Sequence, residues 1–321
     1  MKYSAILLLL IPLLWLGCAE KDSVSEKIAA IPVEIRVERF DREFSDARPA
    51  DLPALKNKFP FLFPANYPDS VWIAKMQDSL QMVLHTEVRE AFEDFGEVEN
   101  SLRRFYQHVL YYFPGQHVPR IIAVTSDVDY RNRIILTDTL LLIGLDNYLG
   151  KDHRFYEGID RYIAEGLDRQ YLISDVAGAF AKKVVVPPQQ RTFLARMLYY
   201  GKELYLKERL IPFVSDAQKM GYTEDELAWA RANEEQIWRY FIERELLYST
   251  DNQLDARFLD PAPFSKFRLE LIDGESPGRV GRYIGWQIVR AFMDRNNISL
   301  QQLLQLPADQ IFQQANYKPK K

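Results

Sequence analysis

The sequence predicts an α+β protein that is predominantly helical, with a small β-sheet in its N-terminal half. Two observations predict the sheet: apolar and charged residues alternate with period two over residues 33–40, and apolar runs of strand length occupy residues 120–125 and 133–144. A third predicts the helices, because the apolar period becomes helical beyond residue 150. Strands followed by a long run of helices are typical of the α+β class.

The expected elements of the N-terminal part begin with the strand at residues 33–40, which opens the sheet. Residues 51–68 are rich in proline and phenylalanine, and we expect them to be irregular. Asp69 or Ser70 is suited to cap one continuous helix, whose apolar stripe runs from Trp72 through Leu80 to Val88. A second amphipathic helix is expected near residues 98–113, before a Pro-Gly pair.

The two strand-like runs at residues 120–125 and 133–144 fit either a hairpin or two neighbouring strands. Helical periodicity and capping patterns predict everything that follows. The expected helices cover residues 171–185, a segment from Phe193 to at least Leu204, one long helix from the Thr223 and Glu226 capping box to Leu247, residues 278–293 and residues 300–306.

The N-terminus has the pattern of a bacterial lipoprotein leader. Lys2 supplies a positive charge, residues 5–16 are apolar, and Gly17 precedes Cys18, the only cysteine. The apolar run is too short to span a bilayer, which takes ~20 residues. We predict a signal peptide at residues 1–17 and lipid attachment at Cys18, through which the chain binds membrane lipid. A free cysteine behind an ordinary signal peptide or an uncleaved anchor is the alternative.

Composition sets the remaining organisation. Residues 18–30 are polar and short, and we expect a lipidated N-terminus followed by a flexible tether. Residues 31–321 contain no comparable linker and no repeat, so they are expected to form a single compact domain. Because the net charge is −4, we expect no nucleic-acid partner. With one cysteine, stability must come from a packed core.

The search for a metal or cofactor site finds none. The sequence has no HExxH motif, and its four histidines, His85, His108, His117 and His153, lack metal-ligand spacing. His108 and His117 flank a Pro-Gly turn and could converge, although structural or surface roles are favoured. We therefore predict no metal, no cofactor and no catalytic residue.

Other polar residues have equally weak signals. Ser265 and Ser276 lie in expected loops without a neighbouring base, and there is no GxSxG motif. Asp127 and Asp129 could bind calcium, but they lack the glycine and glutamate of a calcium loop, so a solvated turn is favoured. Glu234 and Glu235 point in different directions on a helix.

Gly281 and Gly285 have GxxxG spacing in the last long expected helix. Several arginines in this helix argue against membrane insertion, so we expect the two glycines to let another backbone approach closely. Aromatic residues make up 13% of the chain, which suits partner or glycan contact surfaces as well as a core.

With these features laid out, the chain resembles the gliding-motility lipoprotein GldB family. The resemblance is carried by the leader and by six blocks in fixed order: LIGLDNYLG (142–150), RMLYYGKELYL (196–206), GYTEDELAWARANEEQIWRYFIERELLYSTD (221–251), APFSKF (262–267), SPGRVGRYIGWQIVRAFM (276–293) and YKPKK (317–321). It implies a membrane-anchored, non-enzymatic component of the gliding-motility and associated secretion machinery. Its partners would be envelope proteins of that machinery, and residues after Cys18 favour the outer membrane.

A more distant similarity is to zincin-type metallopeptidases, in which the helix near residues 193–206 would carry HExxH. This chain has no histidine there, so the similarity implies a degenerate zincin-like arrangement without catalysis. Two other hypotheses remain open: an envelope hydrolase with an unrecognised site, and a ligand- or glycan-binding lipoprotein.

Overall fold

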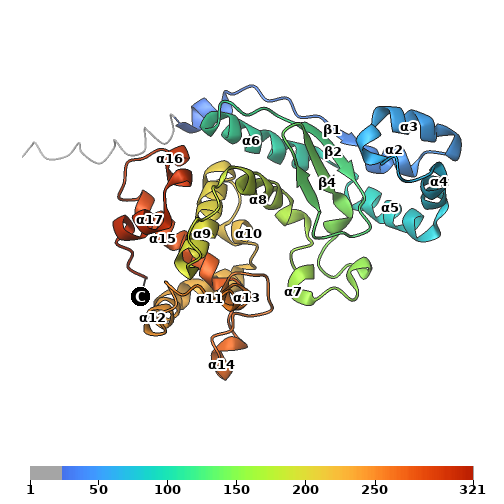
Figure 1. The fold of residues 1–321 in the computed structure, drawn as a ribbon. Coiled ribbons are helices and arrows are strands. Elements are labelled where there is room, and N and C mark those ends of the chain that lie inside the picture. Colours follow the sequence, from blue (N-terminus) through green and yellow to red (C-terminus); the bar gives the residue numbers. More distant parts are fainter. Residues whose placement is uncertain (1–23, 321) are drawn as a thin grey trace, which may run out of the picture.

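The computed structural model describes residues 24–320 and confirms the helix-rich α+β class (Figure 1). Its sheet has the strand order β1-β2-β4-β3, in which β1, β2 and β4 are parallel and β3 is antiparallel to β4. The strands are β1 (Val37–Arg39), β2 (Arg120–Val124), β3 (Ile134–Leu136) and β4 (Leu140–Gly144).

The sheet corrects two expectations. Residues 133–144 are not one strand but a β3–β4 hairpin, because the chain turns at Thr137, whose backbone N–H donates to the Leu140 carbonyl at 2.8 Å. The expected strand at residues 33–40 shortens to β1, since α2 begins at Phe40. The run at 120–125 is confirmed as β2, which is the parallel neighbour of β4.

Four helices lie beside the sheet and are drawn in blue and cyan in Figure 1. They are α2 (Phe40–Ser45), α3 (Leu52–Lys58), α4 (Asp69–Gln77) and α5 (Ser79–Ala91). The prediction that residues 51–68 are irregular was wrong at α3. Its proline lies in the first turn, where a missing N–H costs nothing, and Leu52, Leu55 and Phe59 are buried against Phe44.

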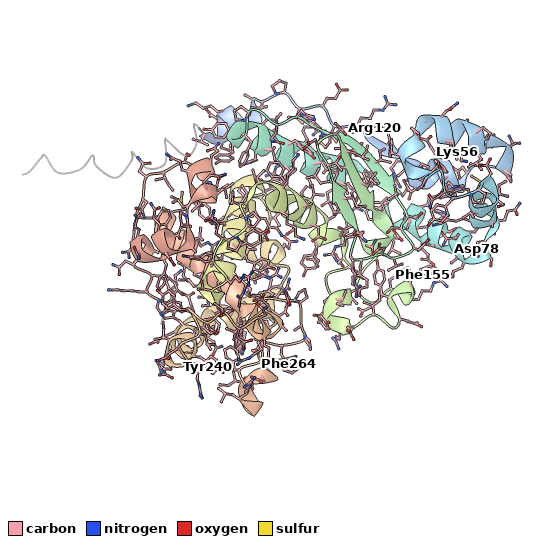
Figure 2. All side chains as sticks on the ribbon, viewed as in Figure 1. Lys56, Asp78, Arg120, Phe155, Tyr240 and Phe264 are labelled. Carbon is pink, nitrogen blue, oxygen red and sulfur yellow. The ribbon has the colours of Figure 1, made fainter. Side chains whose placement is uncertain are left out.

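Helices α4 and α5 were predicted as one helix and are separated at Asp78 (Figure 2). The Asp78 backbone is extended, and its carboxylate accepts the Gln81 backbone N–H at 2.9 Å, which starts α5. As a result Leu80, expected on the apolar stripe, is 62% exposed. An aspartate that caps a new helix overrides the helical period here.

The remaining helices make up most of the molecule. They are α6 (Gly96–Tyr112), α7 (Arg161–Ala164), α8 (Leu172–Val184), α9 (Phe193–Leu210), α10 (Asp216–Met220), α11 (Glu224–Ala232), α12 (Glu234–Glu243), α13 (Gln253–Phe258), α14 (Glu270–Asp273), α15 (Val280–Met293), α16 (Leu300–Gln305) and α17 (Ala308–Ala315). Single-turn 3-10 helices lie at Pro49–Asp51, Pro60–Leu62, Leu145–Asn147, Arg154–Tyr156 and Arg169–Tyr171. One apolar cluster runs from the sheet through α6, α8 and α9 to α15 and α17.

The capping box at Thr223 is confirmed, because the Thr223 hydroxyl accepts the Glu226 N–H at 3.2 Å and Glu226 accepts the Thr223 N–H at 2.8 Å. The single long helix predicted after it was wrong, since α11 ends at Asn233 and α12 ends before Leu247. Helix α17 was not predicted.

Helices α9 and α15 cross at two glycines, which confirms the expected close backbone approach at Gly285. A Cβ on Gly285 would lie 2.0 Å from the Met197 carbonyl oxygen, and a Cβ on Gly201 would lie 2.3 Å from the Gly285 carbonyl oxygen. The other glycine of the motif, Gly281, also has a backbone close by, since a Cβ there would lie 2.9 Å from the Phe258 carbonyl oxygen and 2.9 Å from the Leu259 side chain.

The second half of the expected tether is packed on the body. Residues 24–29 are helical, Ile28 is buried, and the Gln107 side chain of α6 donates to the Ala29 and Ile31 carbonyls at 3.0 and 3.1 Å. The predicted signal peptide, Cys18 and the first half of the tether lie outside the described residues.

Candidate functional site

A cleft of about 800 Å³ lies between the hairpin side of the sheet and the helical C-terminal half. Its lining comes from the segment before β3, from α7 and α8, from α9, from the turn between α10 and α11, and from the start of α15. Ligand sites in proteins commonly occupy ~300–1,000 Å³, so this cleft is large enough to hold an organic ligand.

Helix α9 forms one wall of the cleft with Tyr200, Glu203 and Lys207. Positions three and four apart share a helix face, which brings these three side chains together. Glu203 is only 8% exposed, and one of its carboxyl oxygens, Oε1, has no hydrogen-bond partner among the described residues. Burial raises the pKa of Glu203, and the Tyr199 hydroxyl and the charges of Arg282, Lys207 and Lys182 partly offset this rise.

Lys207 is held by oxygen acceptors. Its Nζ donates to the Ser174 hydroxyl of α8 and to the Lys219 carbonyl of α10, both at 3.0 Å. Burial lowers the pKa of Lys207 to about 8. Gly178 leaves room for this side chain, since a Cβ there would lie 3.3 Å from the lysine Cε.

Two arginines at the start of α15 form the next part of the wall. The Arg282 guanidinium lies 3.8 Å from the centre of the Tyr200 ring and donates to the Leu259 carbonyl. Arg279 has φ +63°, and its guanidinium donates to the Gly221 carbonyl at 2.6 Å. Carbonyl contacts orient both cations without neutralising their charge.

Arg133 and Asp175 lie on the sheet side of the cleft. Arg133 Nε donates to Asp175 Oδ2 at 2.7 Å, and the buried Tyr148 hydroxyl donates to the same oxygen at 3.0 Å. Burial opposes the charge of Arg133, but the Asp175 carboxylate raises the pKa of Arg133 overall, so the guanidinium stays charged. It connects the hairpin to α8.

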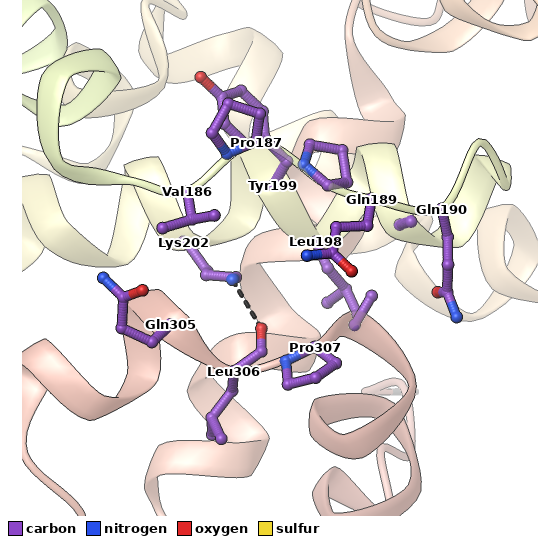
Figure 3. A pocket seen from close by; sticks show the side chains of 13 residues that line it. Val186, Pro187, Gln189, Gln190, Leu198, Tyr199, Lys202, Gln305, Leu306 and Pro307 are labelled. Atoms are coloured by element: carbon purple, nitrogen blue, oxygen red, sulfur yellow. Dashed lines mark hydrogen bonds between the residues drawn. The ribbon is translucent and has the colours of Figure 1, made fainter.

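A second cavity, of about 150 Å³, lies between α9 and the α16–α17 turn (Figure 3). Lys202 points into this region, and its Nζ donates to the Leu304 and Leu306 carbonyls at 3.1 and 2.8 Å. Burial lowers the pKa of Lys202 to about 8. The lysine binds the carbonyl end of α16, where a positive charge is favourable, so its role is structural.

A family model described as "Gliding motility protein GldB" matches residues 21–319, nearly the whole chain. The chain belongs to the GldB family. Membership confirms the resemblance predicted from the sequence blocks and links the chain to gliding motility and, through a family of lipoproteins, to the cell envelope. No curated protein and no solved structure matches the chain.

The histidines of this GldB family member do not form a site. His85 is buried on α5, where burial lowers its pKa, and neither ring nitrogen has a partner in the described part of the chain. His108 lies on α6, where burial lowers its pKa to about 4, and no hydrogen bond joins it to His117. His153 Nε2 lies 3.4 Å from a Glu87 carboxylate oxygen. Within residues 24–320, no three His, Cys, Asp or Glu side chains gather into a possible metal site.

The two loop serines bind each other's segments. Ser276 Oγ donates to the Ser265 carbonyl at 3.1 Å, and Ser265 Oγ donates to the Pro277 carbonyl at 2.7 Å. Both are buried, so they close a loop and have no base beside them. The structure also separates Glu234 from Glu235: Glu234 is buried, whereas Glu235 pairs with Arg239 at 3.1 Å.

Glu234 is a structural anchor that the sequence did not indicate. Its two oxygens accept the Tyr283 hydroxyl at 2.7 Å, the Tyr317 hydroxyl at 2.9 Å and the Lys320 N–H at 3.0 Å. The basic C-terminal tail is thereby held against α12 and α15.

The turn that contains Asp127 and Asp129 is held by a buried carboxylate beneath it. Asp127 pairs with Lys75 at 2.8 Å, and the fully buried Asp146 accepts backbone N–H groups of Ser126 and Val128 at 2.9 and 2.6 Å. Asp146 lies in the LIGLDNYLG block, which the sequence reading used only for the resemblance.

None of the charged residues of the cleft was predicted to belong to a functional site. A signal was present in the RMLYYGKELYL block, where Tyr200 and Glu203, with Lys207 one residue beyond the block, repeat at helical spacing. Among residues 24–320, no helix has both the length and the apolar character needed to cross a membrane.

Proposed function

We propose that the chain is a lipid-anchored, non-enzymatic component of the gliding-motility machinery and of its associated secretion apparatus. Acylated Cys18 holds it to the outer membrane, and the folded body docks envelope proteins. The observation that carries this proposal is the GldB family match over residues 21–319. The leader pattern around Cys18 supports the anchor.

The contacts in the cleft support a non-enzymatic role. Arg133 is paired with Asp175. Lys207 donates to the Ser174 hydroxyl, and that hydroxyl donates its own proton to the Gln218 carbonyl at 2.8 Å, so the serine proton is directed away from the lysine. Glu203 has no histidine, serine or second carboxylate hydrogen-bonded to it in the described part of the chain.

The anchor is tested with Cys18→Ser expressed at the native level. We expect loss of labelled palmitate, release of the protein from the membrane fraction and loss of gliding on agar. Ser25→Ala, seven residues away, is the control and should change none of the three. Normal labelling and fractionation of Cys18→Ser would refute the anchor, and protease shaving of intact cells reports the leaflet.

The alternative, an envelope hydrolase related to zincin-type metallopeptidases, is tested by metal analysis of the purified full chain. The proposal expects no stoichiometric zinc. Bound zinc that is lost on His108→Ala or His117→Ala would favour the hydrolase instead. Gliding that persists in a strain without the protein would contradict the motility role itself.

A further inference from the structure

We propose that the cleft between the sheet and α9 is a binding site for a short acidic saccharide, one that carries carboxylate or phosphate groups. This inference goes beyond the proposed motility role and does not depend on the lipid anchor.

The charge of the cleft is opposite in sign to that of the protein. The chain has a net charge of −4, yet seven lysines and arginines line the cleft against four carboxylates. Five of these cations form no salt bridge within residues 24–320. They are Arg131, Lys182, Lys207, Arg279 and Arg282. A concave surface with an excess of one charge concentrates the field and attracts ligands of the other sign.

Glu203 indicates that the ligand carries hydroxyl groups as well as negative charge. Glu203 lines the cleft, and its buried Oε1 lacks a partner among the described residues, although leaving such an atom unpaired costs about 1–3 kcal/mol. A rotation of the carboxyl group is what would present this oxygen to a ligand. A simple anion would be repelled by this carboxylate. A sugar hydroxyl can pair with it while the acidic group of the same ligand pairs with the surrounding cations.

Tyrosine rings supply the apolar part of the surface. Tyr130 and Tyr162 are half-buried at the sheet side of the cleft, and Tyr200 lies opposite on α9. An aromatic ring presents a flat apolar face and a polar hydroxyl, which matches the C–H face and the hydroxyl groups of a sugar ring. The volume of about 800 Å³ accommodates a short oligosaccharide.

Two neighbouring lysines provide a matched test. Lys182 and Lys183 are both exposed on α8, but Lys182 lines the cleft, whereas Lys183 pairs with Asp138 outside it. Calorimetry with the full acylated chain in detergent uses trigalacturonate as the carboxylate probe and glucose 6-phosphate as the phosphate probe. Maltotriose and inorganic phosphate are the neutral and sugar-free controls.

We expect one acidic probe to bind and to weaken as salt is added. Lys182→Gln should weaken it by about three- to tenfold, the range of one charge-assisted contact near the surface, while Lys183→Gln leaves it unchanged. Glu203→Gln should change binding of the acidic sugar but not of inorganic phosphate. The better acidic probe identifies the source of the charge.

Four results would overturn the inference: no binding of either acidic probe at millimolar concentration, equal binding of maltotriose, equal binding of inorganic phosphate, or equal loss in the two lysine variants. Unfolding curves of each variant show whether it is folded. Since calorimetry measures saccharide binding and not membrane attachment, failure of this inference is distinct from failure of the anchor.

Discussion

Replacing Gly285 with alanine tests whether backbone contact between α9 and α15 sets the stability of the whole fold. Inside an exposed helix, Gly→Ala stabilises by about 1 kcal/mol. Here the new Cβ would lie 2.0 Å from the Met197 carbonyl oxygen, and real Cβ contacts essentially never fall below 3.0 Å. The two helices must therefore separate by about 1 Å, which breaks packing along the centre of the core.

Overpacking of a core typically costs about 1–3 kcal/mol, and we expect at least about 3 kcal/mol because the clash is with backbone that cannot rotate away. With an unfolding entropy of about 2.1 cal/mol/K per residue and about 300 residues, a loss of about 3 kcal/mol lowers the melting temperature by roughly 5 °C. Urea and thermal unfolding followed by circular dichroism measure the change. Gly274→Ala is the matched control, since a Cβ there meets nothing within 4 Å and its φ is −68°. A Gly285→Ala variant as stable as the parent would refute the reasoning.

Three further changes test separate parts of the fold. Between pH 8 and 9.5, the free energy of unfolding should rise by about 1–2 kcal/mol per buried lysine. Burial lowers the pKa of Lys202 to about 8 in the folded protein, so over this range the unfolded lysine holds a proton that the folded one has lost. In urea unfolding, Lys202→Met should flatten the rise with pH, and an unchanged dependence on pH would contradict this account. Asp146→Asn should cost about 2–3 kcal/mol, since an amide offers one oxygen to the N–H groups that the carboxylate accepts, and equal melting temperatures would count against this role. Glu234→Gln should loosen the C-terminal tail and speed its digestion by carboxypeptidase, whereas the exposed Glu235→Gln should not; equal digestion would show that the tail is held by other contacts.

The sequence predicted helices correctly where the apolar period and a capping pattern indicated the same start. Helix α9 has a continuous apolar period, and Thr223 with Glu226 forms the capping box that its spacing indicates. Periodicity failed where a polar residue interrupted a helix inside an unbroken pattern. Asp78 caps the start of α5, whereas the Asn233 side chain donates to the Trp229 carbonyl at the end of α11. Proline-rich composition predicted an irregular segment at residues 51–68, although the proline of α3 lies in the first turn, where a helix tolerates it.

The cleft could not be predicted from spacing, because its parts are far apart in the chain. Arg133 follows a loop, Lys182 lies on α8 and Arg282 lies on α15, and only the packing of α8 and α15 against α9 brings them together. The glycine contact was easier to predict, since Gly285 belongs to a short motif whose physical meaning is local. The one local signal for the cleft was the pair of charged residues, Glu203 and Lys207, on one face of a helix. It did not indicate which residues of other elements lie opposite them.

The docking of residues 24–30 on α6 has a consequence for how the body would stand over a bilayer. If Cys18 carries the lipid, five residues separate it from Val24, and a fully extended chain between these two positions reaches at most about 20 Å. A compact body of about 300 residues is roughly 50 Å across, so the linker is shorter than the body is wide and one side of the molecule would stay near the lipid headgroups. Inserting a few Gly-Ser repeats after Glu20 would lengthen the linker without touching the fold, and would reveal whether motility depends on that enforced posture.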